Sequence, residues 1–256
     1  MEQKITGAVG VSVPITGERT YLPYISEIKN RTIKYIDVVS CGYDINGGDT
    51  NIPFGDCTLS LVRKDTTEMF IEEADLFQFN PQYREGQRMF IGEKIDPEKS
   101  FIRVTNANAV GKICFLVFYW QDSNVTIPTD TDIKRHTTNE AICVGIKSFL
   151  TDSRVLANKK IVGISPAVVT KDKNGNTNGF GEYSGMLTDA YINLVKGSNI
   201  FFKNVPVLCL QRYNNWINTL CFDMAEMDMT NSFVQVSPQE IGFFMGNSFV
   251  FDFEYI

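Results

Sequence analysis

His136 is the only histidine of the chain, so any Ser/His/Asp or Cys/His mechanism would depend on it. It follows Lys134 and Arg135 within residues 121–139, a polar segment that holds almost no large apolar side chains. We interpret this segment as a connector, which is a poor place to hold a general base within hydrogen-bonding distance of a substrate. We therefore expect no catalysis at His136, and a zinc site built on a single histidine is equally disfavoured.

The six cysteines are scattered and form no Cys-x-x-Cys pair: Cys41, Cys57, Cys114, Cys143, Cys209 and Cys221. A disulfide framework or a metal site would show cysteines at recurring spacings. We therefore expect neither, and we expect most of these residues to be small buried hydrophobes in a reducing compartment.

Two Asn-Gly segments, residues 44–49 (Asp-Ile-Asn-Gly-Gly-Asp) and 172–176 (Asp-Lys-Asn-Gly-Asn), look like the start of a calcium-binding loop. The glutamate that closes an EF-hand loop at its twelfth position is missing, since Gly55 and Tyr183 stand there. Asn-Gly is also the strongest signal for a hairpin turn. We interpret both segments as structural turns, and the sequence alone leaves calcium binding at them open.

Acidic, glycine-rich and aromatic groups offer no stronger site. Residues Glu68, Glu72, Glu73 and Asp75 could supply the paired carboxylates of a glycosidase, but their counterparts later in the chain include Lys203, Asn204 and Pro206, so we expect a charged solvent face. The glycines at 175, 179, 181 and 185 match neither a dinucleotide-binding nor a phosphate-binding loop, and we interpret residues 171–185 as an exposed loop.

A sugar-stacking platform could be built from five aromatic residues: Tyr83, Tyr119, Trp120, Tyr213 and Trp216. Aromatic residues on strands more often belong to a core or an interface. We therefore expect no catalytic, cofactor-binding or metal-binding residues, and no cofactor.

The chain contains one stretch twice. Residues 96–104 (Asp-Pro-Glu-Lys-Ser-Phe-Ile-Arg-Val) return as residues 228–236 (Asp-Met-Thr-Asn-Ser-Phe-Val-Gln-Val). Both copies indicate a turn followed by a strand. Other segments match in the same order: 30–36 with 158–164, 44–47 with 172–175, 61–63 with 194–196, 70–79 with 201–210, and 115–118 with 249–252 at an offset of 134. This ordered series indicates a duplicated β domain.

Short alternating segments separated by turn residues predict the fold. Candidate strands cover residues 5–16, 20–26, 32–40, 57–63, 68–79, 89–95, 101–105 and 113–120, and then 141–150, 160–170, 189–195, 199–210, 219–224, 233–236 and 240–255. Even spacing of this kind is typical of antiparallel sandwiches. A short helix near residues 81–87 or 139–149 stays open.

The sequence therefore predicts an all-β protein made of two tandem antiparallel β-sandwiches that arose by internal duplication. We place the first at residues 1–124, a polar connector at 125–138, and the second at 139–256. Each ends on its longest apolar segment, which we expect in the middle of a sheet. That position of the last strand favours jelly rolls over other Greek-key sandwiches.

Composition limits the classes of function. Hydrophobic residues make up 43% of the chain and charged residues 21%, as expected of a globular protein. The formal net charge of −6 argues against a large nucleic-acid surface, which needs a basic excess. The first residues lack the apolar region of a secretory signal, and no apolar run reaches the length of a membrane span, so we expect synthesis as a soluble protein in the cytoplasm of the cell that produces it.

Two fused β-sandwiches of this size, with no apparent catalytic site, resemble the double jelly-roll major capsid proteins of icosahedral viruses. The resemblance covers nearly the whole chain at the level of architecture, and the repeated Asp-x-x-x-Ser-Phe-[Ile/Val]-x-Val segment carries the duplication. It implies two upright jelly rolls side by side, homotrimers that form pseudo-hexagonal capsomers, and assembly into a shell with other virion proteins. It also makes the loop at 171–185 a candidate for the exterior.

The resemblance thus implies a structural protein of the virion, most readily that of a bacteriophage. A minor capsid, vertex or decoration protein is a related alternative. A carbohydrate-binding β-sandwich of the fibre or adhesin type is an alternative from a different class, and a hydrolase on a jelly-roll scaffold is the least favoured.

Overall fold

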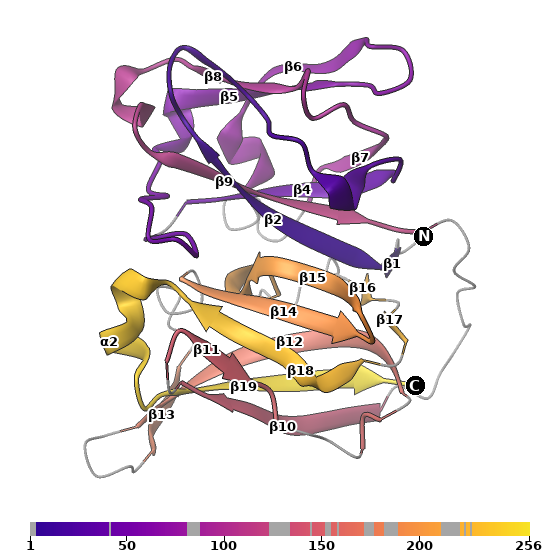
Figure 1. Ribbon diagram of the computed structural model, residues 1–256, viewed down its shortest axis with the longest axis vertical. Coiled ribbons are helices and arrows are strands. Elements are labelled where there is room, and N and C mark those ends of the chain that lie inside the picture. Colours follow the sequence, from indigo (N-terminus) through magenta and orange to yellow (C-terminus); the bar gives the residue numbers. More distant parts are fainter. Residues whose placement is uncertain are drawn as a thin grey trace.

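The computed structural model describes residues 4–40, 42–80, 88–122, 134–143, 145–151, 155–157, 159–171, 177–181, 189–210, 221–222, 224–225 and 227–256 (Figure 1). We call residues 4–122 the first half and residues 134–256 the second half. Strands dominate both halves, and the fold class is all-β, as the sequence predicts.

The first half contributes two four-stranded antiparallel layers. One has the order β2-β9-β4-β7 and the other β3-β8-β5-β6. The strands are β2 (Gly7–Pro14), β3 (Arg19–Tyr21), β4 (Ile33–Val39), β5 (Cys57–Val62), β6 (Met69–Asp75), β7 (Phe90–Glu93), β8 (Phe101–Val104) and β9 (Ile113–Trp120). Short 3-10 turns accompany them: η1 (Ser26–Ile28), η2 (Phe54–Asp56), η3 (Leu76–Phe79) and η4 (Ala107–Ala109).

The second half has corresponding layers. One runs β11-β18-β14-β15, and the other runs β10-β19-β12 with β17 paired to the start of β12 and β13 to its end. The elements are β10 (Lys134–Ile142), β11 (Lys147–Phe149), β12 (Lys160–Lys171), β13 (Thr177–Gly181), β14 (Ala190–Lys196), β15 (Asn199–Pro206), η5 (Val207–Leu210), β16 (Cys221–Phe222), β17 (Met224–Ala225), β18 (Asp228–Val236), η6 (Pro238–Glu240), α2 (Ile241–Phe244) and β19 (Ser248–Tyr255).

The strand order is the same in both halves. With β1 (Lys4–Ile5), β13 and β16 set aside as additions, each half pairs its first strand with its last, and the last lies between the first and the third. In the other layer of each half, the strands follow the order second, seventh, fourth, fifth. This is the order of an eight-stranded jelly roll, and it places β9 and β19 inside their sheets, where the sequence predicts them.

The two halves share one sheet. Strands β15 and β2 pair in parallel, Phe202 with Ala8 and Lys203 with Val9, which joins four strands of each half into an eight-stranded sheet. In Figure 1 these two strands lie side by side where the indigo and orange parts of the molecule meet. Strand β1 (Lys4–Ile5) also pairs in parallel with β16 of the second half.

The repeated segment makes the same hydrogen bonds in both halves. The Ser100 hydroxyl donates to the Asp96 carbonyl at 2.7 Å and accepts the Val62 N–H at 3.0 Å. The Ser232 hydroxyl donates to the Asp228 carbonyl at 2.7 Å and accepts the Val195 N–H at 3.0 Å. Both serines are fully buried. The two copies of the motif therefore have one structural role, which is to tie the start of the segment, a turn before β8 in the first half and the beginning of β18 in the second, to a neighbouring strand.

A bulge is also repeated. Glu73 in β6 and Asn204 in β15 both have positive φ, 46° and 53°. Their N–H groups donate 3.0 Å bonds to a polar side chain on the adjacent strand, Ser60 in the first half and Asn193 in the second. Left-handed backbone is uncommon for residues other than glycine, so its occurrence at matched positions indicates one local geometry used twice.

Strand pairing corrects the sequence alignment of the last strands by one residue. Ile33 pairs with Trp120, and its counterpart Ile161 pairs with Tyr255. The register then shifts by one residue at the same place in both pairs of strands. Strand β9 therefore matches β19 at an offset of 135, and the offset of 134 that aligns Phe115 with Phe249 is wrong.

Burial explains why β9 is apolar throughout while β19 alternates. Alternate residues of β9, such as Leu116 and Phe118, lie in the core of the first half, and the others, such as Val117 and Tyr119, join the core of the second half. A strand buried on both faces reads as a continuous apolar run. In β19, Phe249, Phe251, Phe253 and Tyr255 are buried, and the residues between them are partly exposed.

Several predicted boundaries are wrong. Strand β10 begins at Lys134, so residues 134–138 belong to a strand and not to the connector. Residues 177–181 form β13, paired to β12, so the segment 171–185 is in part a hairpin. The predicted strands at 68–79 and 199–210 end in 3-10 turns, and 240–247 holds α2 and turns. Residues 139–143 and 145–149 contain strand and not helix, and residues 81–87 lie outside the described part.

Candidate functional site: the junction between the two halves

The backbones of the two halves approach closely where β2 meets β15. Gly10 lies in β2, and a Cβ atom at this position would be 2.1 Å from the carbonyl oxygen of Asn204. Glycine in a strand often marks such a close approach of another backbone. Beside it, Lys203 forms a salt bridge with Glu27 at 2.5 Å. Burial opposes ionisation of Glu27, but the bond from Lys203 lowers the pKa of its carboxyl below the usual value.

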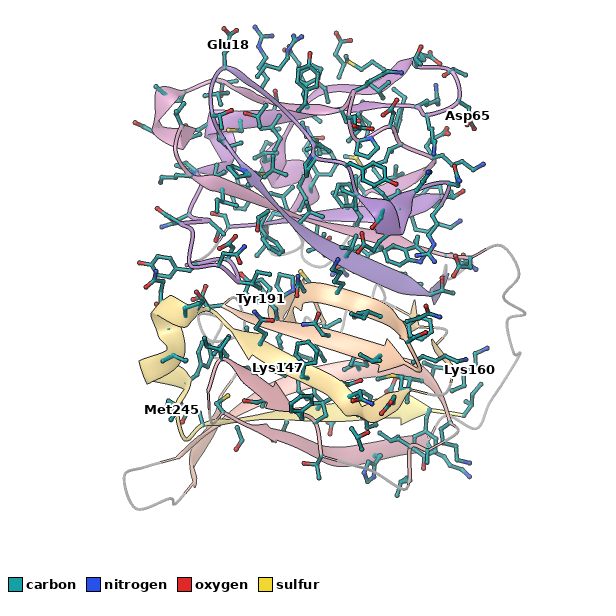
Figure 2. All side chains as sticks on the ribbon, in the orientation of Figure 1. Glu18, Asp65, Lys147, Lys160, Tyr191 and Met245 are labelled. Atoms are coloured by element: carbon teal, nitrogen blue, oxygen red, sulfur yellow. The ribbon has the colours of Figure 1, made fainter. Side chains whose placement is uncertain are left out.

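A second contact between the two halves involves Tyr43, which lies in the loop after β4. Its N–H donates to the Asp189 carboxylate at 2.9 Å, and its carbonyl accepts the Tyr191 hydroxyl at 2.7 Å. The Tyr191 ring also packs 5.3 Å from that of Phe115, and Figure 2 shows Tyr191 at the level where the halves meet. Burial raises the pKa of Asp189 to about 6, and Glu240 adds to the rise while the Tyr43 N–H opposes it.

A buried charged network forms the third contact. Arg88 donates through Nε to both carboxylate oxygens of Asp37 at 3.0 Å, and through Nη2 to the Cys209 carbonyl of the second half at 2.8 Å. The Tyr119 hydroxyl donates to Asp37 at 2.8 Å. Only 7% of the Arg88 side chain and 1% of the Asp37 side chain are exposed.

Charge compensation keeps the buried Arg88 guanidinium protonated. Burial alone would lower the pKa of the Arg88 guanidinium, but the Asp37 carboxylate raises it above its ordinary value. Burial and the same carboxylate raise the pKa of the Tyr119 hydroxyl. The network is not duplicated, since the counterparts of Asp37 and Tyr119 are Ser165 and Glu254. It therefore belongs to the junction and not to the jelly roll as such.

A hollow of about 470 Å³ opens beside the junction. Arg31 covers one face of the Trp120 ring at 4.5 Å from its centre and pairs with Asp122 at 3.3 Å. Trp120 is buried towards the core of the first half, and Tyr119 is buried on the opposite face of β9. These two residues therefore form no exposed sugar-stacking platform, and Tyr83, Tyr213 and Trp216 lie outside the described residues.

The residues singled out in the sequence lie apart from one another. His136 is in β10 on the outer sheet of the second half. Asp44 accepts N–H bonds from Asn46 and Gly48, which closes residues 44–48 into a turn, and a hydroxyl bond from Ser12, which ties the turn to β2. The second such turn, residues 172–176, lies outside the described part.

The acidic group on and before β6 is partly neutralised. Glu68 pairs with Arg63 at 2.7 Å, and Glu73 pairs with Arg103. Glu72 is exposed on the edge strand. This arrangement is a charged surface, as the sequence indicates.

Four of the cysteines are small buried residues, as expected. Cys57, Cys114, Cys143 and Cys209 are buried and take part in no disulfide. Burial raises the pKa of the Cys57 thiol to about 11 and that of Cys143 to about 12. Such thiols are unreactive at neutral pH because the thiolate is the nucleophile.

Sequence reasoning missed the Arg88 network. The available signals were Asp37 inside an otherwise largely apolar strand and Tyr119 inside the apolar run of β9. Neither residue indicates which side chain or carbonyl it contacts, because Arg88 and Cys209 lie far away in the chain.

No protein-family model matches this chain, and no curated protein and no solved structure was found to be similar to it. Within the described ranges, no helix has the length and apolar character needed to cross a membrane. In the same part of the chain, no three His, Cys, Asp or Glu side chains gather as ligands for a metal ion.

Proposed function

We propose that this protein is a structural component of a virion, most specifically a major capsid protein that forms pseudo-hexameric trimers and then a shell. The observation that carries the proposal is the pairing of β15 with β2, through which two units of the same strand order extend one sheet. A unit that joins its own copy within one chain has the geometry to join further copies between chains. We infer that the chain arose by duplication of one such unit, and that it acts in the viral particle after synthesis in a host, for which a bacterium is our proposal.

Exposed apolar side chains support self-association. Tyr21 is 53% exposed and packs against Phe101, while Phe149 is 52% exposed and packs against Phe233. These pairs occupy matched positions in the two halves, each with a cation over a ring. Surface aromatic groups of this kind are enriched at protein interfaces. Other large apolar side chains are exposed as well: Tyr24, Phe77, Phe90, Phe243 and Met245.

Negative-stain imaging of the concentrated protein tests the proposal. We expect closed shells or flat sheets of pseudo-hexagonal units. Dispersed single particles at every concentration, together with selective retention on a glycan array, would instead favour the carbohydrate-binding sandwich.

A further inference from the structure

The parallel pairing of β15 with β2, which we call the internal joint, uses two strands whose counterparts, β6 and β10, lie at the edges of their sheets. By strand pairing, β15 corresponds to β6, since Leu194 pairs with Phe202 as Leu61 pairs with Ile71. Strand β2 corresponds to β10, since each pairs with the last strand of its half. In the described part of the chain, β6 and β10 each have a strand on one side alone. The chain thus carries one joined pair of edges and one matching pair that is not joined.

Matched positions define what a second joint would look like. Within the chain, Lys203 of β15 lies opposite Val9 of β2. The counterpart of Lys203 is Glu72, because Asn204 and Glu73 occupy the same bulge. The counterpart of Val9 is His136, since Val9 pairs with Phe118 and His136 with the matching Phe253. A second joint of the same kind would therefore place Glu72 opposite His136 of another copy.

The two open edges carry opposite charge. Strand β6 contains Glu72, Glu73 and Asp75, and β10 begins with Lys134, Arg135 and His136. Glu72 and Lys134 are both exposed. In a parallel pair with Glu72 opposite His136, Lys134 lies two residues away on the same face of the sheet as Glu72. The internal joint is also supported by an ion pair, Lys203 with Glu27, of the reverse polarity.

We propose that copies of this chain join head to tail by parallel pairing of β6 of one copy with β10 of the next. The proposal rests on the proposed function and identifies the contact through which copies assemble. Because the two surfaces differ, the contact is heterologous, and it closes into a ring when the rotation per copy allows it. It also covers two exposed edges that would otherwise invite unspecific pairing.

A disulfide tests the register. One protein carries Glu72→Cys and a second carries His136→Cys, and the two are mixed and mildly oxidised. Facing residues on neighbouring strands lie within the Cα separation that a disulfide spans. We expect a covalent dimer of about twice 28.9 kDa in the mixture, and not in either protein alone or in the unsubstituted protein. Asp75→Cys mixed with His136→Cys is the matched control, because roughly 10 Å of strand separates the two positions.

Charge reversal tests the same contact without cysteines. Glu72→Lys or Lys134→Glu alone is expected to raise the protein concentration needed for assembly roughly tenfold, since like charges then meet across the joint. The chain that carries both substitutions should assemble within about threefold of the original, because the pair is restored with opposite polarity. Glu98→Lys, an exposed position away from both edges, is the control and should have no such effect.

The outcomes separate the two proposals. Trimers or shells that form without the disulfide, and that respond to Glu72→Lys no more than to Glu98→Lys, would overturn the β6–β10 joint and leave the capsid proposal standing. A protein that stays monomeric in all these experiments would overturn both. The expected disulfide together with rescue by the double reversal would support the joint.

Discussion

A buried serine hydroxyl that accepts one N–H and donates to one carbonyl cannot become a methyl group without leaving that N–H unpaired. Ser100 and Ser232 are in this position, with the same two bonds each. At the scale of residues, the two matching segments therefore share their hydrogen bonds, and this likeness can be tested as a shared energetic effect.

Ser100→Ala and Ser232→Ala should each lower the free energy of unfolding by about 1–3 kcal/mol, the cost of one buried group left unpaired. The two losses should be similar, because the bonds and the burial match. Urea unfolding followed by fluorescence measures them, with Ser26→Ala as an exposed control. A loss at only one of the two serines would contradict the shared role.

Arg88→Met leaves the Asp37 carboxylate buried without its cation. We expect a loss of about 3–5 kcal/mol, the range for breaking a buried ion pair from one side. A thermal unfolding scan measures the loss. Asp37→Asn combined with Arg88→Met should recover part of it, since no buried charge then lacks a partner. A loss below about 1 kcal/mol, as for an exposed pair, would show that the network is open to water.

Asp189 should make the junction depend on pH. Its pKa is raised to about 6 from an ordinary value of 3.8, so the folded protein holds a proton that the unfolded chain loses between about pH 4 and 6. Stability from this group is therefore highest below pH 4 and falls as the pH rises to 6. Asp189→Asn should remove that part of the slope in urea unfolding measured from pH 4 to 7. Identical slopes for both proteins would contradict the assignment.

At the scale of elements, the glycine at the joint is a specific requirement. Gly10→Ala would place a Cβ atom against the Asn204 carbonyl and push β2 away from β15. We expect a loss of about 1–3 kcal/mol, typical of overpacking, and faster proteolysis between the halves. Gly17→Ala is the control, because a Cβ atom there meets nothing within 4 Å. Equal proteolysis rates for both variants would mean that the strands separate without cost.

Most strands could be predicted from the sequence, and their ends could not. Alternation and turn residues identify β4, β5, β8 and β9 closely, because each is a half- or fully buried strand bounded by turns. The sequence does not show where β6 and β15 give way to 3-10 turns, since apolar residues continue into η3 and η5. The beginning of strand β10 was not predicted because its residues are polar, which is common for a strand at the edge of a sheet.

The contacts between the two halves could not be predicted from the sequence, for a different reason. Its contacts join residues more than a hundred positions apart, such as Arg88 with Cys209 and Tyr43 with Asp189. Periodicity reports which face of a strand is buried and not which partner covers it. Besides Asp37, the usable sign was the unbroken apolar run of β9, which is explained by its burial between two cores.

At the scale of the whole molecule, the two halves differ most where their surroundings differ. Strand β9 lies between two cores and is apolar on both faces, whereas its counterpart β19 carries Asp252 and Glu254 on the outer face. Each half thus contacts the other half within the chain and, in our proposal, also contacts a half of another copy. The formal net charge of −6 fits a protein whose partners are copies of itself more closely than one that coats nucleic acid.

The absolute mass of the purified protein, measured by light scattering after size exclusion over a range of concentrations, tests self-assembly most directly. The account predicts a discrete trimer of about 87 kDa, three times the chain mass of 28.9 kDa, followed by larger assemblies as the concentration rises. A mass that stays at 28.9 kDa at every concentration would contradict it.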